Sequence, residues 1–173
     1  MAHIELSQAE ETLRGAARYS RHEGSFRPNA DGATRTMEEA VEIAARNGIA
    51  FDPAEYKIMV DPVLRADYAN YFDLAHAVPG SIVPWRRITA GDSRIVIRVQ
   101  RHTLTSDEAI VAVLAHELHE TQALKEEFAR SGGSMPVERL RRLVESSGES
   151  LHNAAWDYAD ELLDRIRAEG RTP

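Results

Sequence analysis

The segment spanning residues 110–120, IVAVLAHELHE, limits the fold more than any other part of the chain. It begins as an apolar run and ends with four ionisable residues, which are His116, Glu117, His119 and Glu120. Apolar residues surround the expected helix on most sides, so these side chains are not set apart on a solvent-facing surface. Isolated charges are costly to bury, whereas charges that coordinate a metal or pair with one another are tolerated. The segment therefore predicts a buried helix whose polar side chains need a partner.

The spacing of these residues places three of them on one side of the helix. A helix advances about 100° per residue, so His116, His119 and Glu120 fall within an arc of about 100°, while Glu117 lies on its flank. Imidazole nitrogens and carboxylate oxygens are common ligands of a metal ion, and this grouping indicates a metal site. In the alternative interpretation the residues are structural, with a histidine bonded to a backbone carbonyl and the glutamates paired at the helix surface.

The composition restricts both the chemistry and the partners of the chain. None of the 173 residues is cysteine, so disulfides, thiolate ligands and a cysteine nucleophile are excluded, and a metal would be held by nitrogen and oxygen. The formal net charge is -7 and the arginines are scattered, so we expect no nucleic-acid partner. No apolar stretch approaches the ~20 residues of a membrane-spanning helix, and the N-terminus lacks the pattern of a secretory signal. We therefore expect no membrane partner and a cytoplasmic location, with export by a specialised secretion machine as the alternative.

Capping residues and hydrophobic periodicity predict a chain in which helices come before and after the strands of a small sheet. A capping-box pattern occurs twice before such helices, as Thr36 with Glu39 and as Thr105 with Glu108. The expected helices span residues 8–19, 37–46, 106–129, 137–144 and 149–168, the expected strands span residues 56–60 and 94–100, and residues 78–84 are expected to form a loop. No internal repeat or interdomain linker is visible, so residues 1–173 are expected to form a single domain. The predicted fold class is α+β, mainly helical, with the small sheet preceding the buried helix.

The strand expected over residues 94–100, the capped start of the next helix and the sequence VLAHEL resemble the metal-binding helix of zincin metallopeptidases. The likeness covers about thirty-five residues, 94–128. In that family the motif is H-E-x-x-H, in which two histidines one turn apart hold Zn²⁺ and the glutamate between them activates a water molecule. This chain matches the first two positions with His116 and Glu117, and has Glu120 in place of the second histidine. A carboxylate oxygen is also a zinc ligand, so the resemblance implies a buried Zn²⁺ site on this helix.

A zincin-like site takes a further ligand from a later helix, and the segment ESLH at residues 149–152 offers two candidates. His152 projects into the apolar stripe of the last expected helix, which favours it, whereas Glu149 falls near the edge of that stripe. The alternative for His152 is a core histidine whose hydrogen bonds are satisfied locally. The order of a His/Glu helix, a spacer and a second buried helix with a histidine favours a metal ligand at residue 152.

These patterns together lead to the hypothesis of a small zincin-like hydrolase acting on a peptide or protein substrate. His116, Glu120 and His152 are the expected ligands of Zn²⁺, and Glu117 is the expected general base. His119 is expected to act as a fourth ligand or as a donor to the developing oxyanion. The sequences VLAHELHE and LHNAAWDYAD are similar to C-terminal domains of bacterial polymorphic toxins, which implies a bacterial effector-like hydrolase. The rival hypothesis is a non-catalytic interaction domain in which the same cluster is a buried polar network.

Overall fold

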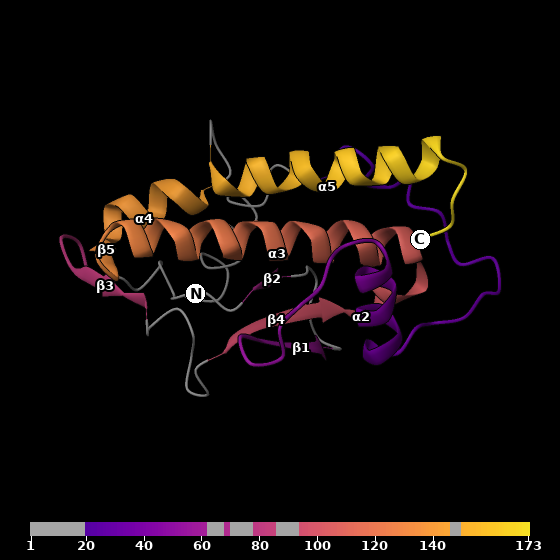
Figure 1. The fold of residues 1–173 in the computed structure, drawn as a ribbon, viewed down its shortest axis with the longest axis horizontal. Helices are drawn as coiled ribbons and strands as arrows, with labels where there is room; N and C mark the ends of the chain where they lie inside the picture. The colour runs from indigo at the N-terminus through magenta and orange to yellow at the C-terminus, as the bar shows by residue number, and fades with distance from the viewer. Residues whose placement is uncertain (1–19, 62–67, 70–77, 86–93, 146–149) are drawn as a thin grey trace, which may run out of the picture.

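The computed structural model describes residues 20–61, 68–69, 78–85, 94–145 and 150–173. Along the chain its elements are α2 (Met37–Arg46), β1 (Tyr56–Asp61), β2 (Tyr68–Ala69), β3 (Ile82–Pro84), β4 (Ile95–Gln100), the 3-10 helix η3 (Arg101–Thr105), α3 (Asp107–Arg130), β5 (Ser134–Pro136), α4 (Val137–Val144) and α5 (Leu151–Ala168), as Figure 1 shows. Helices dominate this α+β fold, which confirms the fold class expected from the sequence. The helix expected over residues 8–19 lies outside the described residues. None of the described helices combines the length and the apolar character needed to cross a membrane.

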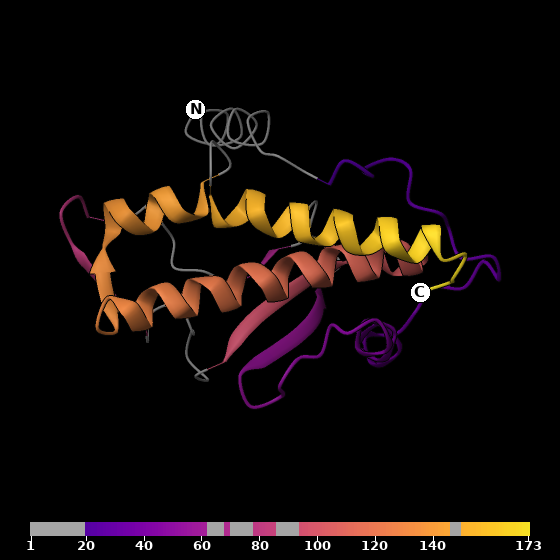
Figure 2. The same cartoon turned by 45° about the horizontal axis from the view of Figure 1, so that its top comes forward.

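Helix α3 lies at the centre of the arrangement. It runs between α5 on one side and the sheet of β1, β4 and β2 on the other, while α2 packs against α3 and β1 (Figures 1 and 2). Helices α3 and α5 run antiparallel and side by side, and they share the most extensive contact between two described elements. Residues 108–118 of α3 are all buried, as expected for a helix that is covered on both sides.

The three-stranded sheet has the strand order β1-β4-β2. Strands β1 and β4 are parallel, with Tyr56 opposite Ile95, and β2 is antiparallel to β4. Ile95, Ile97 and Val99 alternate along β4 and are all buried, which confirms the alternation seen in the sequence. Val96 is buried as well, so side chains on both faces of β4 are covered at this point. The two expected strands are observed within one residue of their expected ends.

Helices α2 and α4 begin where their sequences predict, and α5 begins at Leu151, two residues after its expected start. The hydroxyl of Thr36 accepts a hydrogen bond from the backbone N–H of Glu39, whose carboxylate accepts one from the N–H of Thr36, so the first capping box is confirmed. Pro136 immediately precedes α4. The hydroxyl of Ser150 caps α5 by accepting a hydrogen bond from the N–H of Asn153.

The second expected capping box, of Thr105 with Glu108, is wrong. Residues up to Thr105 form the 3-10 helix η3, and the hydroxyl of Ser106 caps the first turn of α3 instead. The Glu108 carboxylate accepts hydrogen bonds from the backbone N–H of Arg27 and from the guanidinium of Arg167 in α5. Long-range partners have therefore replaced the local cap, and they tie the start of α3 to the end of α5.

The prediction of a loop over residues 78–84 is wrong for its last three residues, because Ile82–Pro84 form the strand β3. This strand pairs antiparallel with β5, and Val83 lies opposite Met135. Each strand has only three residues, which is too short for an alternating pattern to be visible in the sequence. The pairing also joins segments that are far apart along the chain, so no local turn signal announces it.

Two clusters of buried apolar side chains meet along α3. The larger one joins α3 to α2, β4 and α5. The smaller one joins the last turns of α3 to β3, β5 and α4, and consists of Val83, Leu124, Phe128, Met135, Val137 and Leu140. Glu120 lies between Leu118, which belongs to the larger cluster, and Leu124, which belongs to the smaller one. Along α3, Glu120 therefore lies at the boundary between the two clusters.

Substitution of Ile97 tests the placement of β4 in the core. Ile97 is fully buried, so Ile97→Ala should lower the free energy of unfolding by about 2–5 kcal/mol, because it removes apolar contacts and leaves a cavity. Urea denaturation followed by circular dichroism measures this change. Lys57→Ala, at an exposed position of the neighbouring strand β1, is the control. It should change the free energy of unfolding by less than about 0.5 kcal/mol. Equal effects of the two substitutions would contradict the placement of Ile97.

Candidate metal centre

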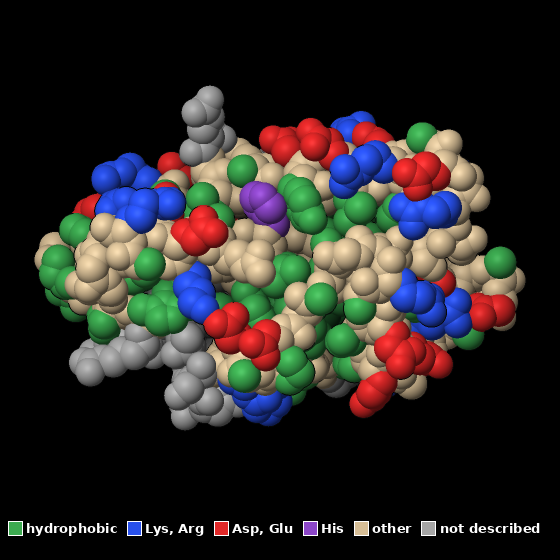
Figure 3. All heavy atoms as spheres, viewed as in Figure 1, with side chains coloured by type: hydrophobic (Ala, Val, Ile, Leu, Met, Phe, Trp, Pro, Cys, Tyr) green, Lys and Arg blue, Asp and Glu red, His purple; other side chains and the backbone are tan. Residues whose placement is uncertain are grey.

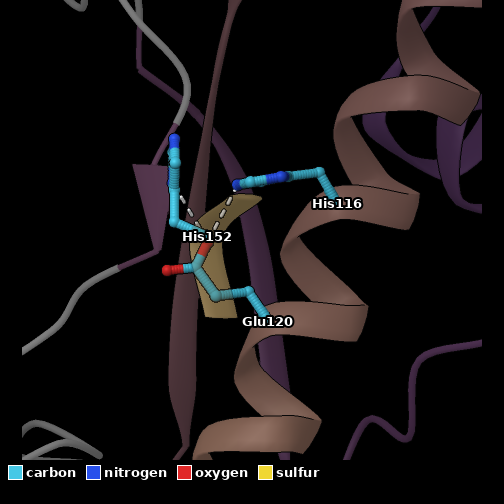
Figure 4. Close-up of side chains that lie close together, drawn as sticks. All are labelled: His116, Glu120 and His152. Carbon is cyan, nitrogen blue, oxygen red and sulfur yellow. Dashed lines mark ion pairs between the residues drawn. The ribbon is translucent and has the colours of Figure 1, made fainter. Parts of the chain in front are cut away.

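The polar residues of α3 meet the beginning of α5. His116 and Glu120 are four residues apart on α3, so they project from the same side of the helix. His152 lies in the first turn of α5. Because α5 runs antiparallel to α3, this first turn lies beside the middle of α3, and the three side chains point toward one another (Figure 4).

One ligand-type atom from each of these side chains converges on a common point. Oε2 of Glu120 lies 2.8 Å from Nε2 of His116 and 3.5 Å from Nδ1 of His152. The three residues offer ligand atoms that all lie within 4.8 Å of one another. Within the described ranges of the chain, no other set of three histidine, aspartate or glutamate side chains converges in this way. The structure therefore brings together the three residues that the sequence predicts as ligands.

The centre is buried on one side and approaches the surface on the other. His116 and Glu120 are each 3% exposed, whereas the side chain of His152 is 21% exposed. On the face shown in Figure 3, a histidine side chain is visible over the beginning of α5, with hydrophobic side chains beside it. Acidic and basic side chains are interspersed over the rest of this face. Of the three residues, His152 is therefore the one in contact with solvent.

Burial and hydrogen bonding determine the charge of the centre. Burial lowers the pKa of His116, because the imidazolium form loses its hydration, and the hydrogen bond to Glu120 opposes this effect only in part. Burial by itself would raise the pKa of Glu120, but the hydrogen bonds and charges of His116 and His152 outweigh it and lower this pKa to about 2. At neutral pH an ionised carboxylate thus faces a neutral His116, and these are the protonation states that bind a metal ion.

The geometry and chemistry of this group fit a metal ion. Zinc bonds to nitrogen and carboxylate oxygen are ~2.0–2.2 Å long, so the ligand atoms of a tetrahedral site lie roughly 3.4 Å apart. The three atoms already lie within 4.8 Å of one another, and side-chain shifts on the order of 1 Å would complete the arrangement. The buried group of His116, Glu120 and His152 can therefore hold a metal ion.

Trp156 contributes a contact that the sequence analysis did not anticipate. Its ring stacks on that of His116, with 4.0 Å between the centroids and 25° between the planes. The ring of His152 lies edge-on to both, at 4.9 Å from His116 and 6.5 Å from Trp156. Trp156 follows His152 by four residues, so both lie on the apolar stripe expected for the last helix, but no local pattern predicts the stack on His116 of another helix.

The two predicted catalytic residues lie beside this group without belonging to it. Glu117 follows His116 directly, about 100° further round α3, and is 5% exposed. The ring of His119 stacks on Tyr158 of α5, at 4.7 Å and 26°. Neither residue is among the three whose ligand atoms converge, so the base and donor roles stay predictions. Glu149, the alternative third ligand, lies outside the described residues.

Comparisons with known proteins assign no family to this chain. No protein-family model, no curated protein and no solved structure matches it. The resemblance of residues 94–128 to the zincin helix therefore stays an expectation from the sequence.

Acid should remove a stabilising contribution of Glu120. Folding lowers the pKa of this group from an ordinary value of 4.5 to about 2, so its ionised form stabilises the fold above pH 4.5, and the contribution is lost as the pH falls toward 2. In chelator-treated protein, the parent should therefore exceed Glu120→Gln in free energy of unfolding above pH 4.5, and this difference should shrink at lower pH. Urea denaturation at a series of pH values measures the difference.

Glu126→Gln is the matched control for this measurement, because Glu126 is an exposed carboxylate on the same helix. It should show no comparable dependence on pH. A difference between the parent and Glu120→Gln that is independent of pH would contradict the lowered pKa of Glu120.

Proposed function

We propose that the chain is a zinc-dependent hydrolase whose metal ligands are His116, Glu120 and His152. The observation that carries this proposal is the convergence of their ligand atoms within 4.8 Å, in a mostly buried position. Two imidazoles and one carboxylate are a ligand set that hydrolytic zinc enzymes use. Calcium and magnesium prefer sites made of oxygen atoms, so the two nitrogen donors favour zinc over these two ions.

The number of ligands supports a catalytic site. Structural zinc ions are almost always held by four protein ligands, whereas catalytic ones have three and keep a position open for water or substrate. The partly exposed side chain of His152 supports access to such a position. When bound, zinc supplies a Lewis acid that polarises a carbonyl group and lowers the pKa of water. Peptide bonds are the proposed substrate, on the basis of the resemblance of residues 94–128 to the zincin helix.

Glu117 and His119 are the proposed catalytic residues. The burial of Glu117 and its position directly after a ligand support its role as the general base, which would take a proton from the attacking water and pass it to the leaving amine. Nδ1 of His119 is buried, and among the described residues it has no hydrogen-bond partner. This nitrogen is therefore available as a donor to the developing oxyanion, and the position of His119 outside the converging group disfavours a fourth ligand.

A second candidate is a non-catalytic interaction domain, and one observation favours it. Glu120 accepts a hydrogen bond from His116 and lies 3.5 Å from His152, so the three side chains also pair with one another directly. In this case the group is a polar network that fixes the packing of α3 on α5. Zinc would then neither bind nor stabilise the protein.

Zinc content separates the two candidates. Protein purified without chelator should contain about one zinc ion per chain, and added Zn²⁺ should raise its melting temperature, because a ligand that binds only the folded state stabilises it. Elemental analysis and thermal denaturation measure the two effects. His116→Ala should abolish both, since it removes a buried nitrogen ligand. His102→Ala, at an exposed histidine of η3, is the control and should retain them.

A parent protein without zinc, and without stabilisation by added Zn²⁺, would reject the zinc site. Zinc binding that survives His116→Ala would instead reject this set of ligands. Either result would leave the polar network as the better account of the three side chains.

Glu117→Gln tests the proposed hydrolysis. The amide cannot accept a proton, so the variant should lose turnover of fluorescein-labelled casein by about 10²–10⁴-fold. Its zinc content and melting temperature should stay close to those of the parent, because the side chain keeps its size and is not a ligand. Glu126→Gln is again the matched control and should keep full turnover.

Zinc-loaded parent protein that does not cleave casein would remove the support for peptide hydrolysis and leave the metal site in place. A Glu117→Gln variant with unchanged turnover and a lowered melting temperature would show that Glu117 has a structural role.

A further inference from the structure

The ring that stacks on His116 belongs to Trp156, a buried residue of α5. Trp156 is 7% exposed, and its indole nitrogen is buried without a hydrogen-bond partner among the described residues. Leaving a buried donor unpaired is unfavourable, so a smaller apolar residue would avoid this cost. Trp156 therefore contributes apolar packing in the larger cluster and, toward His116, the face of its ring.

His116 lacks the contact that usually orients a metal-bound histidine. A ligating imidazole generally donates a hydrogen bond from its second nitrogen to a carboxylate or a carbonyl, and this bond fixes the orientation of the ring. Nε2 of His116 faces Glu120, so the second nitrogen is Nδ1. Nδ1 is buried, and the described residues offer it no hydrogen-bond partner. The indole ring stacks on the face of this imidazole and restricts the orientation of its plane.

We propose that Trp156 is a positioning residue of the zinc site, which holds the imidazole of His116 so that Nε2 points at the ion. This inference rests on the proposed function, because it concerns the orientation of a ligand. Coordination draws electron density from the imidazole, and the electron-rich face of an indole attracts a ring that has gained positive charge. The stack therefore favours the ion-bound state over the ion-free state, and it raises the affinity for the ion.

His152 extends this effect to a second ligand. Its ring lies edge-on to both His116 and Trp156, with interplanar angles of 80° and 87°. Edge-to-face contact is a favourable arrangement of such rings. Removal of the indole would therefore loosen two of the three ligands, whereas Glu120 would keep its place on α3.

The affinity for Zn²⁺, measured by competition with a chromophoric chelator, tests this inference. Trp156→Met fills the space without a planar ring, and it should weaken binding about 10- to 100-fold, the loss typical when a contact that orients a ligand is removed. Trp156→Phe restores a planar ring and should bind close to the parent value. Tyr158→Leu removes the corresponding stack on His119, which is not a proposed ligand, and should leave the affinity unchanged.

Fluorescence gives a second readout that does not require a folded methionine variant. The chain contains two tryptophans, so in Trp85→Phe the emission comes from Trp156 alone. Saturating Zn²⁺ should change this emission, because the indole lies against the ring of a ligand.

The outcomes distinguish this inference from the proposed function. A parent protein that binds no zinc rejects the proposed site itself. A parent that binds zinc overturns the positioning role if folded Trp156→Met binds equally well, or if the emission of Trp156 does not respond to Zn²⁺. Weakened binding in Trp156→Met, with recovery in Trp156→Phe, supports the role.

Discussion

The contact between α3 and α5 is the constraint on which the rest of the structure depends. It encloses the carboxylate of Glu120, which is 3% exposed and has a pKa lowered to about 2. An ionised group buried without partners would cost several kcal/mol, and here the two imidazoles compensate for its lost hydration. Since His116 comes from α3 and His152 from α5, the carboxylate is stabilised only while the two helices stay together. Neither helix by itself contains the centre.

The remaining contacts keep this helix pair in place. The Glu108 carboxylate at the start of α3 accepts a hydrogen bond from the guanidinium of Arg167 near the end of α5. The far end of α3 is held by the smaller apolar cluster around Phe128. The polar group thus lies between two anchored ends, on regular helices rather than loops. Such support is what a metal site needs, because ligands must be held within a fraction of an ångström.

Local patterns account for the features that the sequence predicts correctly. The spacing of His116 and Glu120 places them one turn apart on any helix, and the alternation along β4 identifies its buried face in any sheet. The errors share a physical reason. The capping box at Thr105 fails because Glu108 is bonded to Arg27 and Arg167, and the strand β3 is missed because its partner β5 is distant. In both cases a long-range contact replaced or created the local structure.

The sequence by itself determined a helical α+β chain without cysteine, with imidazole and carboxylate groups inside an apolar helix. It also favoured His152 of the last helix as the third member of the group, with Glu149 as the alternative. Only the tertiary structure decided that His152 reaches Glu120, that Trp156 covers His116, and that His119 stacks on Tyr158 instead of joining the group. The reason is physical: periodicity fixes the direction of a side chain within its own helix, whereas the crossing of two helices fixes which side chains meet.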